Sequence, residues 1–150
     1  MTSQAENASA VRGDLFDPAC PTRRLLDRIG TKWTSMAVKV LAQAAPGEVR
    51  FAQLLRRMPG VSQKMLSATL RSLVRDGLAE RRVEPSVPPG VYYRLTPLGL
   101  SLDTVLAAVR DWAEEHMAEV DRANSLSDRP EKPAERPAGE AGDDAPVRPV

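Results

Sequence analysis

The sequence contains few of the residues from which most catalytic and metal sites are built. Its 150 residues include one cysteine, Cys20, one histidine, His116, and only 4% aromatic residues. A single cysteine excludes an intramolecular disulfide and a cysteine-rich zinc site, and a single histidine leaves few acid–base or metal-binding combinations. No glycine-rich phosphate loop or nucleophile–base pair appears at a usable spacing. We therefore expect a protein that is not an enzyme, with no catalytic residue, no metal site and no cofactor.

Long apolar runs are also missing. No segment approaches the roughly 18 consecutive apolar residues of a membrane helix, and the first residues lack the basic-then-apolar order of an export signal. The sequence therefore predicts a cytoplasmic protein without a membrane partner.

Charge is present and is unevenly distributed, although the net charge is only +1. Residues 22–97 carry 14 Lys and Arg against 5 Asp and Glu, whereas residues 98–121 carry 1 against 6. A basic middle followed by an acidic segment indicates one face for a polyanion and another face turned away from it. The alternative interpretation is that these basic residues are ordinary solvated surface.

Composition divides the chain into three parts. Residues 1–17 are mostly small and polar, and the last part contains five prolines after Arg129 but no aromatic residue. Such segments bury too little apolar surface to offset the entropy lost on ordering. We expect a disordered arm over 1–17, a folded domain over 18–124 and a disordered, proline-rich tail over 125–150.

Helical spacing and end signals predict the elements of that domain. Thr31 and Ser62 are expected helix N-caps, and glycine-containing segments at 45–47, 58–60 and 76–77 end the preceding helices. Pro97 is expected in the first turn of a long acidic helix. The predicted helices are 23–29, 32–44, 51–57, 62–76 and one from 97, and the predicted strands are 78–84 and 91–96. This order predicts a mainly α fold with a small β-hairpin, a winged helix-turn-helix with dimer-forming terminal helices.

The helix at 62–76 is the expected DNA-reading element, because the second helix of a helix-turn-helix enters the major groove. Side chains that can bond to base edges lie opposite its leucines. The expected DNA contacts on this helix are Ser62, Gln63, Lys64, Ser67 and Arg71. The expected phosphate or wing contacts, each equally well explained as solvated charge, are Arg50, Arg56, Arg57, Arg75, Arg81, Arg82 and Arg94.

One recognition helix covers too few base pairs for useful specificity, so we expect a homodimer on double-stranded DNA. The apolar stripe of the last helix exceeds what a small core needs. The expected dimer contacts are Leu25, Leu26, Leu102, Val105, Leu106, Val109 and Trp112. The alternative is a monomer in which the last helix only completes the core.

Several motifs in the same order resemble the HxlR family of bacterial winged-helix regulators. They are Cys20-Pro21, Gly30-Thr31-Lys32-Trp33, residues 50–54, 58–66 and 70–78, residues 91–96 and Leu98-Gly99. The resemblance implies a transcriptional regulator that binds palindromic operators as a cytoplasmic homodimer. The sequence departs from the family at Gly90, where a basic residue is usual, and at Tyr92, where an acidic one is usual. The competing hypothesis is a winged-helix module that binds a protein partner without binding DNA.

Cys20 has two interpretations. It precedes Pro21 at a predicted helix N-terminus, and Arg23 and Arg24 follow, a setting that favours the reactive thiolate. The family resemblance implies a sensor of oxidants or electrophiles at this place, so the effector would be an oxidant or a small molecule. The alternative is a small buried residue with no chemistry.

Overall fold

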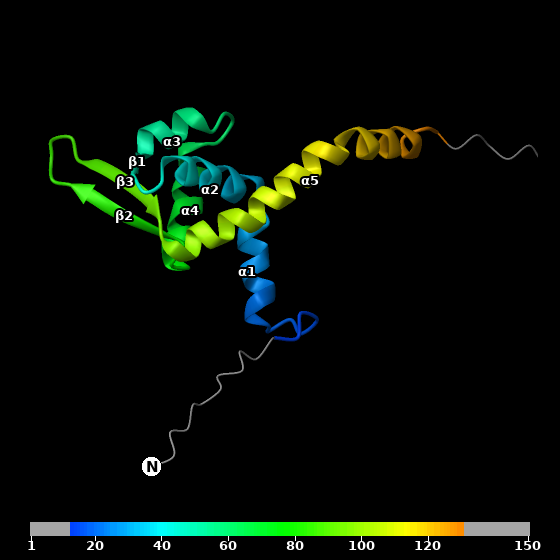
Figure 1. The fold of residues 1–150 in the computed structure, drawn as a ribbon, viewed down its shortest axis with the longest axis horizontal. Coiled ribbons are helices and arrows are strands. Elements are labelled where there is room, and N and C mark those ends of the chain that lie inside the picture. Colours follow the sequence, from blue (N-terminus) through cyan, green and yellow to red (C-terminus); the bar gives the residue numbers. More distant parts are fainter. Residues whose placement is uncertain (1–12, 131–150) are drawn as a thin grey trace, which may run out of the picture. The chain divides into compact units, whose positions relative to one another are not determined.

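The structure is a computed structural model that describes residues 13–130. Residues 1–12 of the predicted arm and residues 131–150 of the predicted tail lie outside the described residues. The elements in order are α1 (Pro21–Ile29), α2 (Lys32–Ala44), β1 (Val49–Arg50), α3 (Phe51–Arg57), α4 (Gln63–Arg75), β2 (Ala79–Glu84), β3 (Gly90–Leu95) and α5 (Pro97–Ser127). Figure 1 shows the β2–β3 hairpin extending beyond α2, α3 and α4. The predicted winged helix-turn-helix is confirmed.

Side-chain caps set the helix starts where the sequence predicts them. The Ser62 hydroxyl accepts a hydrogen bond from the Met65 N–H at 3.0 Å, and Thr31 caps α2 in the same way. The Thr96 hydroxyl accepts from the Gly99 N–H at 3.1 Å at the start of α5. Each cap satisfies a backbone donor that has no partner inside its helix.

The core lies where α2, α3 and α4 meet the sheet, and its largest fully buried side chains are Val38, Leu41, Leu54, Met58, Leu66 and Leu70. Val38 is off the apolar stripe that the periodicity of 32–44 predicts. It is nevertheless fully buried, because α2 contacts α1, α3, α4 and β3 and is therefore covered on more than one side.

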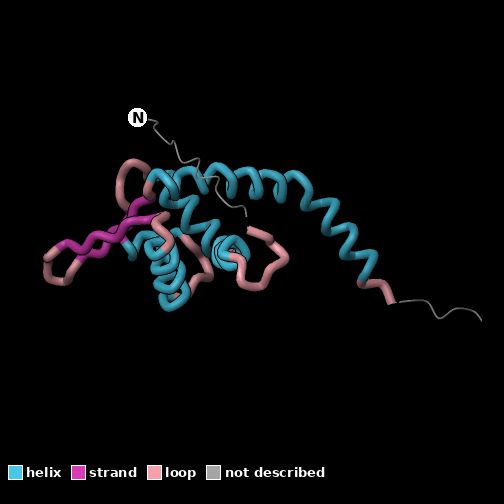
Figure 2. The backbone as a smooth tube through the Cα atoms, turned by 90° about the horizontal axis from the view of Figure 1, so that it is seen from below, coloured by secondary structure: helices cyan, strands magenta, loops and turns pink. Residues whose placement is uncertain are grey.

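The sheet has the strand order β1-β3-β2, with both pairings antiparallel. The hairpin pairs Ala79 with Leu95 and Glu84 with Gly90, and the proline-rich loop at 85–89 joins the two strands. Figure 2 shows this hairpin, in magenta, leading away from the helices. The sequence analysis missed β1, whose Val49 pairs with Tyr93. Two residues are too few to show the alternation by which strands are recognised.

The described chain divides into two compact units, one ending at Ala113 and one beginning at Glu114, so α5 contributes to both. The helix continues to Ser127, three residues past the predicted domain end at 124. Residues 13–17, expected in the disordered arm, take part in two turns, in which the Phe16 and Ala19 N–H groups donate to the carboxylates of Asp14 and Asp17. Among the described helices, none combines the length and the apolar character needed to cross a membrane.

Candidate nucleic-acid interface

Helix α4 presents two different sides. Its apolar side buries Leu66, Leu70 and Leu73 in the core. Gln63, Lys64 and Arg71 are exposed, and Ser67 is half-buried beside them. The Ser62 oxygen is occupied as the N-cap acceptor, so its first role is to fix where the helix begins. The predicted set of base-reading residues is thus brought together at one surface of α4.

The centre of that surface lies slightly away from the predicted one. At 100° per residue, the direction opposite the three leucines is shared by Lys64, Ala68, Arg71 and Arg75. Ala68 is exposed at this centre and was missed, because only polar side chains were considered as base readers. An alanine methyl group can nevertheless contact the thymine methyl group. A search for any exposed residue between Lys64 and Arg71 would have found it.

No acidic residue interrupts α4 from Gln63 to Arg75. The carboxylate of Asp76, just after the helix, is held by Arg28 at 2.8 Å. The surface of α4 therefore offers cations and neutral donors to a polyanion without an opposing negative charge.

The three hairpin arginines differ in what their side chains contact. The Arg82 side chain donates to Glu48, with one hydrogen bond of 2.8 Å, and the Arg94 side chain donates to Glu80 at 2.7 Å. The guanidinium group of Arg82 also lies over the ring of Tyr92. Arg81 makes no hydrogen bond or ion pair with any described residue. Side chains alternate along a strand, so Arg81 lies on the opposite face of the hairpin from Arg82.

The arginines of α3 are also distinct. Arg57 donates a 2.7 Å hydrogen bond to Gln43. Arg56 and Arg57 line a hollow that also contains Glu48. Arg50 lines a different hollow, together with Gln63 and Arg81. Arg50 is therefore grouped with the α4 surface, whereas Arg56 and Arg57 share their surroundings with a carboxylate.

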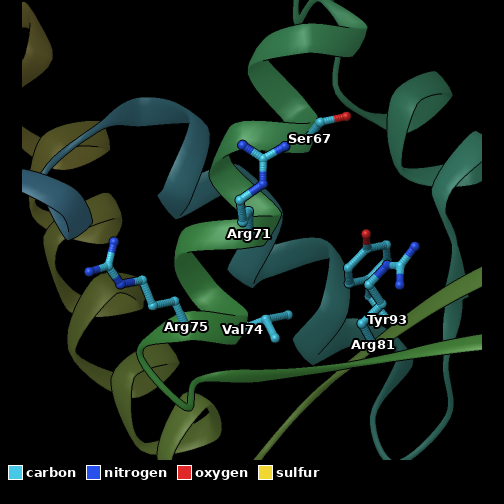
Figure 3. Close-up of a pocket in the computed structure, with 6 residues that line it drawn as sticks. All are labelled: Ser67, Arg71, Val74, Arg75, Arg81 and Tyr93. Carbon is cyan, nitrogen blue, oxygen red and sulfur yellow. The ribbon is translucent and has the colours of Figure 1, made fainter.

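A third hollow, of about 490 Å³, lies between α4 and the hairpin. We refer to it as the α4–hairpin hollow. It is lined by Ser67, Arg71, Val74, Arg75, Arg81 and Tyr93. In Figure 3 the Tyr93 hydroxyl points toward the open space beside α4, and Arg75 points away to the other side of the helix. Of the two adjacent tyrosines, Tyr93 is buried against the core, whereas Tyr92 is half-buried.

Cys20 is the N-cap residue of α1 and is only 4% exposed. The pKa of its thiol is lowered from the ordinary value of 9.0, chiefly because the backbone N–H of Arg23 favours the thiolate, while burial acts in the opposite direction. The preceding turn covers the sulfur so closely that a Cβ at Gly13 would lie 2.6 Å from Sγ. The predicted helix-end setting is present, but the thiol is enclosed.

The expected dimer contacts fall into two groups. Leu102 and Leu106 are half-buried and pack against the core of their own chain. The other five side chains are between 37% and 59% exposed. They are Leu25, Leu26, Val105, Val109 and Trp112.

Comparison with known proteins identifies relatives over most of the described chain. A family profile described as HxlR-like helix-turn-helix matches residues 28–121. The HTH-type transcriptional regulator YtfH of Escherichia coli (strain K12) is 41% identical over 108 residues, which are 72% of this chain and 83% of YtfH.

Two solved structures share the fold. A transcriptional regulator ytfH from Salmonella typhimurium superimposes with a TM-score of 0.69 at 38% identity, covering 75% of this chain and 98% of that one. The redox regulator HypR in its reduced form gives a TM-score of 0.58 at 32% identity, covering 68% and 98%. These relatives are transcriptional regulators, so the comparisons support DNA binding in general and not an enzymatic activity.

Proposed function

Because the chain belongs to the HxlR-like helix-turn-helix family, we propose that it binds palindromic operators as a homodimer and regulates transcription in the cytoplasm, where such operators lie. The observation that carries this proposal is the surface of α4. Lys64 and Arg71 stand exposed on it, opposite three buried leucines and without a carboxylate between them.

The side chains of this surface divide by what they can bind. Gln63 can pair with adenine through two hydrogen bonds, and Lys64 or Arg71 can pair with guanine. Arg50 and Arg81 are proposed as phosphate contacts, because they line one hollow with Gln63 and make no ion pair with a described residue. Four arginines are proposed to contribute less to phosphate binding, because each already lies beside a polar or acidic side chain. They are Arg56, Arg57, Arg82 and Arg94.

The homodimer is proposed from the exposed apolar side chains of α1 and of the first part of α5. Val105, Val109 and Trp112 are each more than half exposed on that part of α5. Leaving several large apolar groups in water is unfavourable by roughly 25 cal/mol per Å² of apolar surface, which pairing with a second copy would remove. A two-fold pair would place its two α4 helices on half-sites about 34 Å apart.

Binding to duplex DNA over a range of salt concentrations tests the main proposal. Affinity should fall steeply with salt because phosphate contacts release counterions. Replacing Gln63 by Ala should flatten the preference for one base, whereas replacing Arg50 by Ala should weaken binding to all sequences alike. Salt-independent or absent binding to DNA would instead support a module that binds a protein partner.

Sedimentation tests the dimer separately. At micromolar concentration the particle should have about twice the chain mass of 16.3 kDa. Replacing Val109 by Glu should shift the particle toward that single mass, whereas replacing the exposed Thr104 by Glu provides a matched control on the same helix. Particles of 16.3 kDa alone for the unaltered protein would contradict the homodimer.

Response to oxidants is proposed through Cys20. Its thiol has a lowered pKa at the N-terminus of α1, and the structural relative HypR is a redox regulator. With no second cysteine in the chain, oxidation would produce a bond between subunits, a mixed disulfide or an adduct. Diamide or a quinone should release the operator from the protein, and replacing Cys20 by Ser should abolish that release. Release that persists in the Cys20→Ser variant would contradict the sensor.

A further inference from the structure

Tyr93 is unusual among the residues around the α4–hairpin hollow. The residue is only 7% exposed, and its ring belongs to the core. Its hydroxyl makes no hydrogen bond with any described residue, and Figure 3 shows it pointing into the hollow. The hydroxyl oxygen itself is not enclosed, because no buried side-chain oxygen of the described residues lacks a hydrogen-bond partner. A tyrosine at the edge of a core commonly buries its ring and presents its hydroxyl to water or to a ligand. This hydroxyl is therefore available to a hydrogen-bond acceptor that enters the hollow.

The groups around that hydroxyl are suited to an oxyanion. Arg71 and Arg81 line the same hollow, and neither forms an ion pair with a described residue. Ser67 adds a hydroxyl from α4. By contrast, the hairpin arginines of the other face, Arg82 and Arg94, are each bound to a glutamate. Free cations and free hydroxyl groups thus gather on the side of the hairpin that faces α4.

The α4–hairpin hollow lies between the two elements that a bound DNA duplex would contact. A neighbouring hollow shares Ser67, Arg81 and Tyr93 and extends toward Arg50 and Gln63, so an open trough runs between α4 and the hairpin. When a recognition helix occupies the major groove and a wing approaches the adjacent minor groove, one phosphate backbone passes between the two. The trough separates these same two elements, α4 and the hairpin.

We propose that the α4–hairpin hollow binds one phosphate of the DNA backbone, to which the Tyr93 hydroxyl donates a hydrogen bond. Ser67 donates a second hydrogen bond, and Arg71 and Arg81 neutralise the charge. The Tyr93 ring is held in the core, so its hydroxyl is less mobile than the solvent-exposed side chains of the arginines. Tyr93 therefore fixes where the DNA backbone lies relative to α4. This inference rests on the proposed function, because it requires that the protein bind DNA.

Removing the Tyr93 hydroxyl tests the proposed phosphate site. Tyr93→Phe keeps the buried ring and should weaken binding about tenfold, to operator and unrelated duplexes alike, because a phosphate carries no sequence information. The slope of log affinity against log salt should stay unchanged, since a neutral donor releases no counterion. Arg81→Gln should instead reduce that slope by about 0.9. Tyr92→Phe is the matched control, because the Tyr92 hydroxyl donates to Glu84 on the other face of the hairpin. The DNA affinity of the Tyr92→Phe variant should equal that of the unaltered protein.

Duplexes with a single neutral methylphosphonate locate the phosphate. At one position the unaltered protein and Tyr93→Phe should bind equally well, whereas at all other positions the difference of about tenfold should remain. The melting temperature of Tyr93→Phe should match that of the unaltered protein, because the Tyr93 hydroxyl bonds to no described residue, and this measurement separates a lost DNA contact from lost folding.

Two results would overturn the phosphate site. One is equal DNA affinity of Tyr93→Phe and the unaltered protein, and the other is a difference in affinity that no methylphosphonate position removes. If the affinities are equal and inorganic phosphate raises the melting temperature of the unaltered protein but not that of Tyr93→Phe, the hollow binds a small anion instead of DNA. If the unaltered protein binds no duplex at any salt concentration, the proposed function itself fails, and that result is distinct from the other two.

Discussion

Arg28, in the last turn of α1, holds Asp76, the residue that ends α4, through two side-chain hydrogen bonds of 2.8 Å each. This bidentate pair connects α1, whose N-cap is Cys20, with α4, which presents the predicted base-reading residues. Asp76 raises the pKa of Arg28 further, so the guanidinium remains charged at every accessible pH. The link between the two helices therefore depends on the carboxylate of Asp76.

Replacing Arg28 by Ala should lower the melting temperature by only about 1–4 °C, because exposed ion pairs contribute little to stability. The Arg28 side chain is 42% exposed, which places the pair in that class. Amide hydrogen exchange should accelerate along α1, which loses its tie to α4. Arg24→Ala, one turn earlier on the same helix, is the control and should leave both measurements unchanged. Unaltered exchange in Arg28→Ala would show that the pair does not hold α1.

Acid should weaken the link between Glu48 and the hairpin. The hydrogen bonds from Arg82 lower the pKa of Glu48 below its ordinary value of 4.5. A carboxyl group with a lowered folded-state pKa stabilises the protein above that ordinary value, and the contribution is lost as pH falls through the folded-state pKa. Glu48→Gln should therefore reduce the free energy of unfolding at neutral pH, and the difference should disappear once the pH lies well below the folded-state pKa of Glu48, where both proteins lack the charge.

Urea unfolding at several pH values measures this difference. Glu80→Gln removes the other carboxylate of the hairpin pairs and is a useful comparison, because Glu80 is more exposed than Glu48. A difference between Glu48→Gln and the unaltered protein that stays constant from neutral to acid pH would show that charge is not its cause.

Local signals in the sequence were enough to predict the caps and helices. The hydroxyl of Ser62 is followed by a helical apolar stripe, and the bounds of α3 match the predicted ones because Met58-Pro59-Gly60 cannot continue a helix. The candidate surface of α4 followed from the same periodicity. These features depend on residues within about one or two turns of each other.

Features that depend on distant residues were not predictable. Arg82 is held by Glu48, 34 residues earlier in the chain, so its sequence context gives no sign that it differs from Arg81. Val38 is buried because α2 is covered on several sides, which a single amphipathic stripe does not indicate. The strand β1 exists because β3 offers an edge, not because two residues have a strand pattern of their own.

Gly99 should be essential for the start of α5. A Cβ at this position would collide with the backbone carbonyl of Leu78, and backbone cannot swing aside as a flexible side chain can. Gly99→Ala should therefore lower the free energy of unfolding by about 1–3 kcal/mol, the usual effect of overpacking. Urea unfolding measures it, with the exposed Ser101→Ala on the same turn as a near-neutral control. Equal stability of the two variants would contradict the close contact.

The ionisation of Cys20 can be followed by its rate of alkylation with iodoacetamide, because only the thiolate reacts. The Arg23 N–H stabilises the thiolate, so the pH midpoint of the rate should lie below the ordinary thiol pKa of 9.0 in the folded protein and return to an ordinary value in urea. The absolute rate should nevertheless be low in the folded protein, because the thiol is buried.

Gly13→Ala separates these two effects. The added methyl group would press against the sulfur and displace the covering turn, so alkylation should become faster while the pH midpoint, which depends on α1, changes little. Ala19→Gly, an exposed position in the same turn, is the matched control and should react like the unaltered protein. If Gly13→Ala reacts no faster, the turn does not limit access to the thiol, and enclosure of Cys20 has another origin.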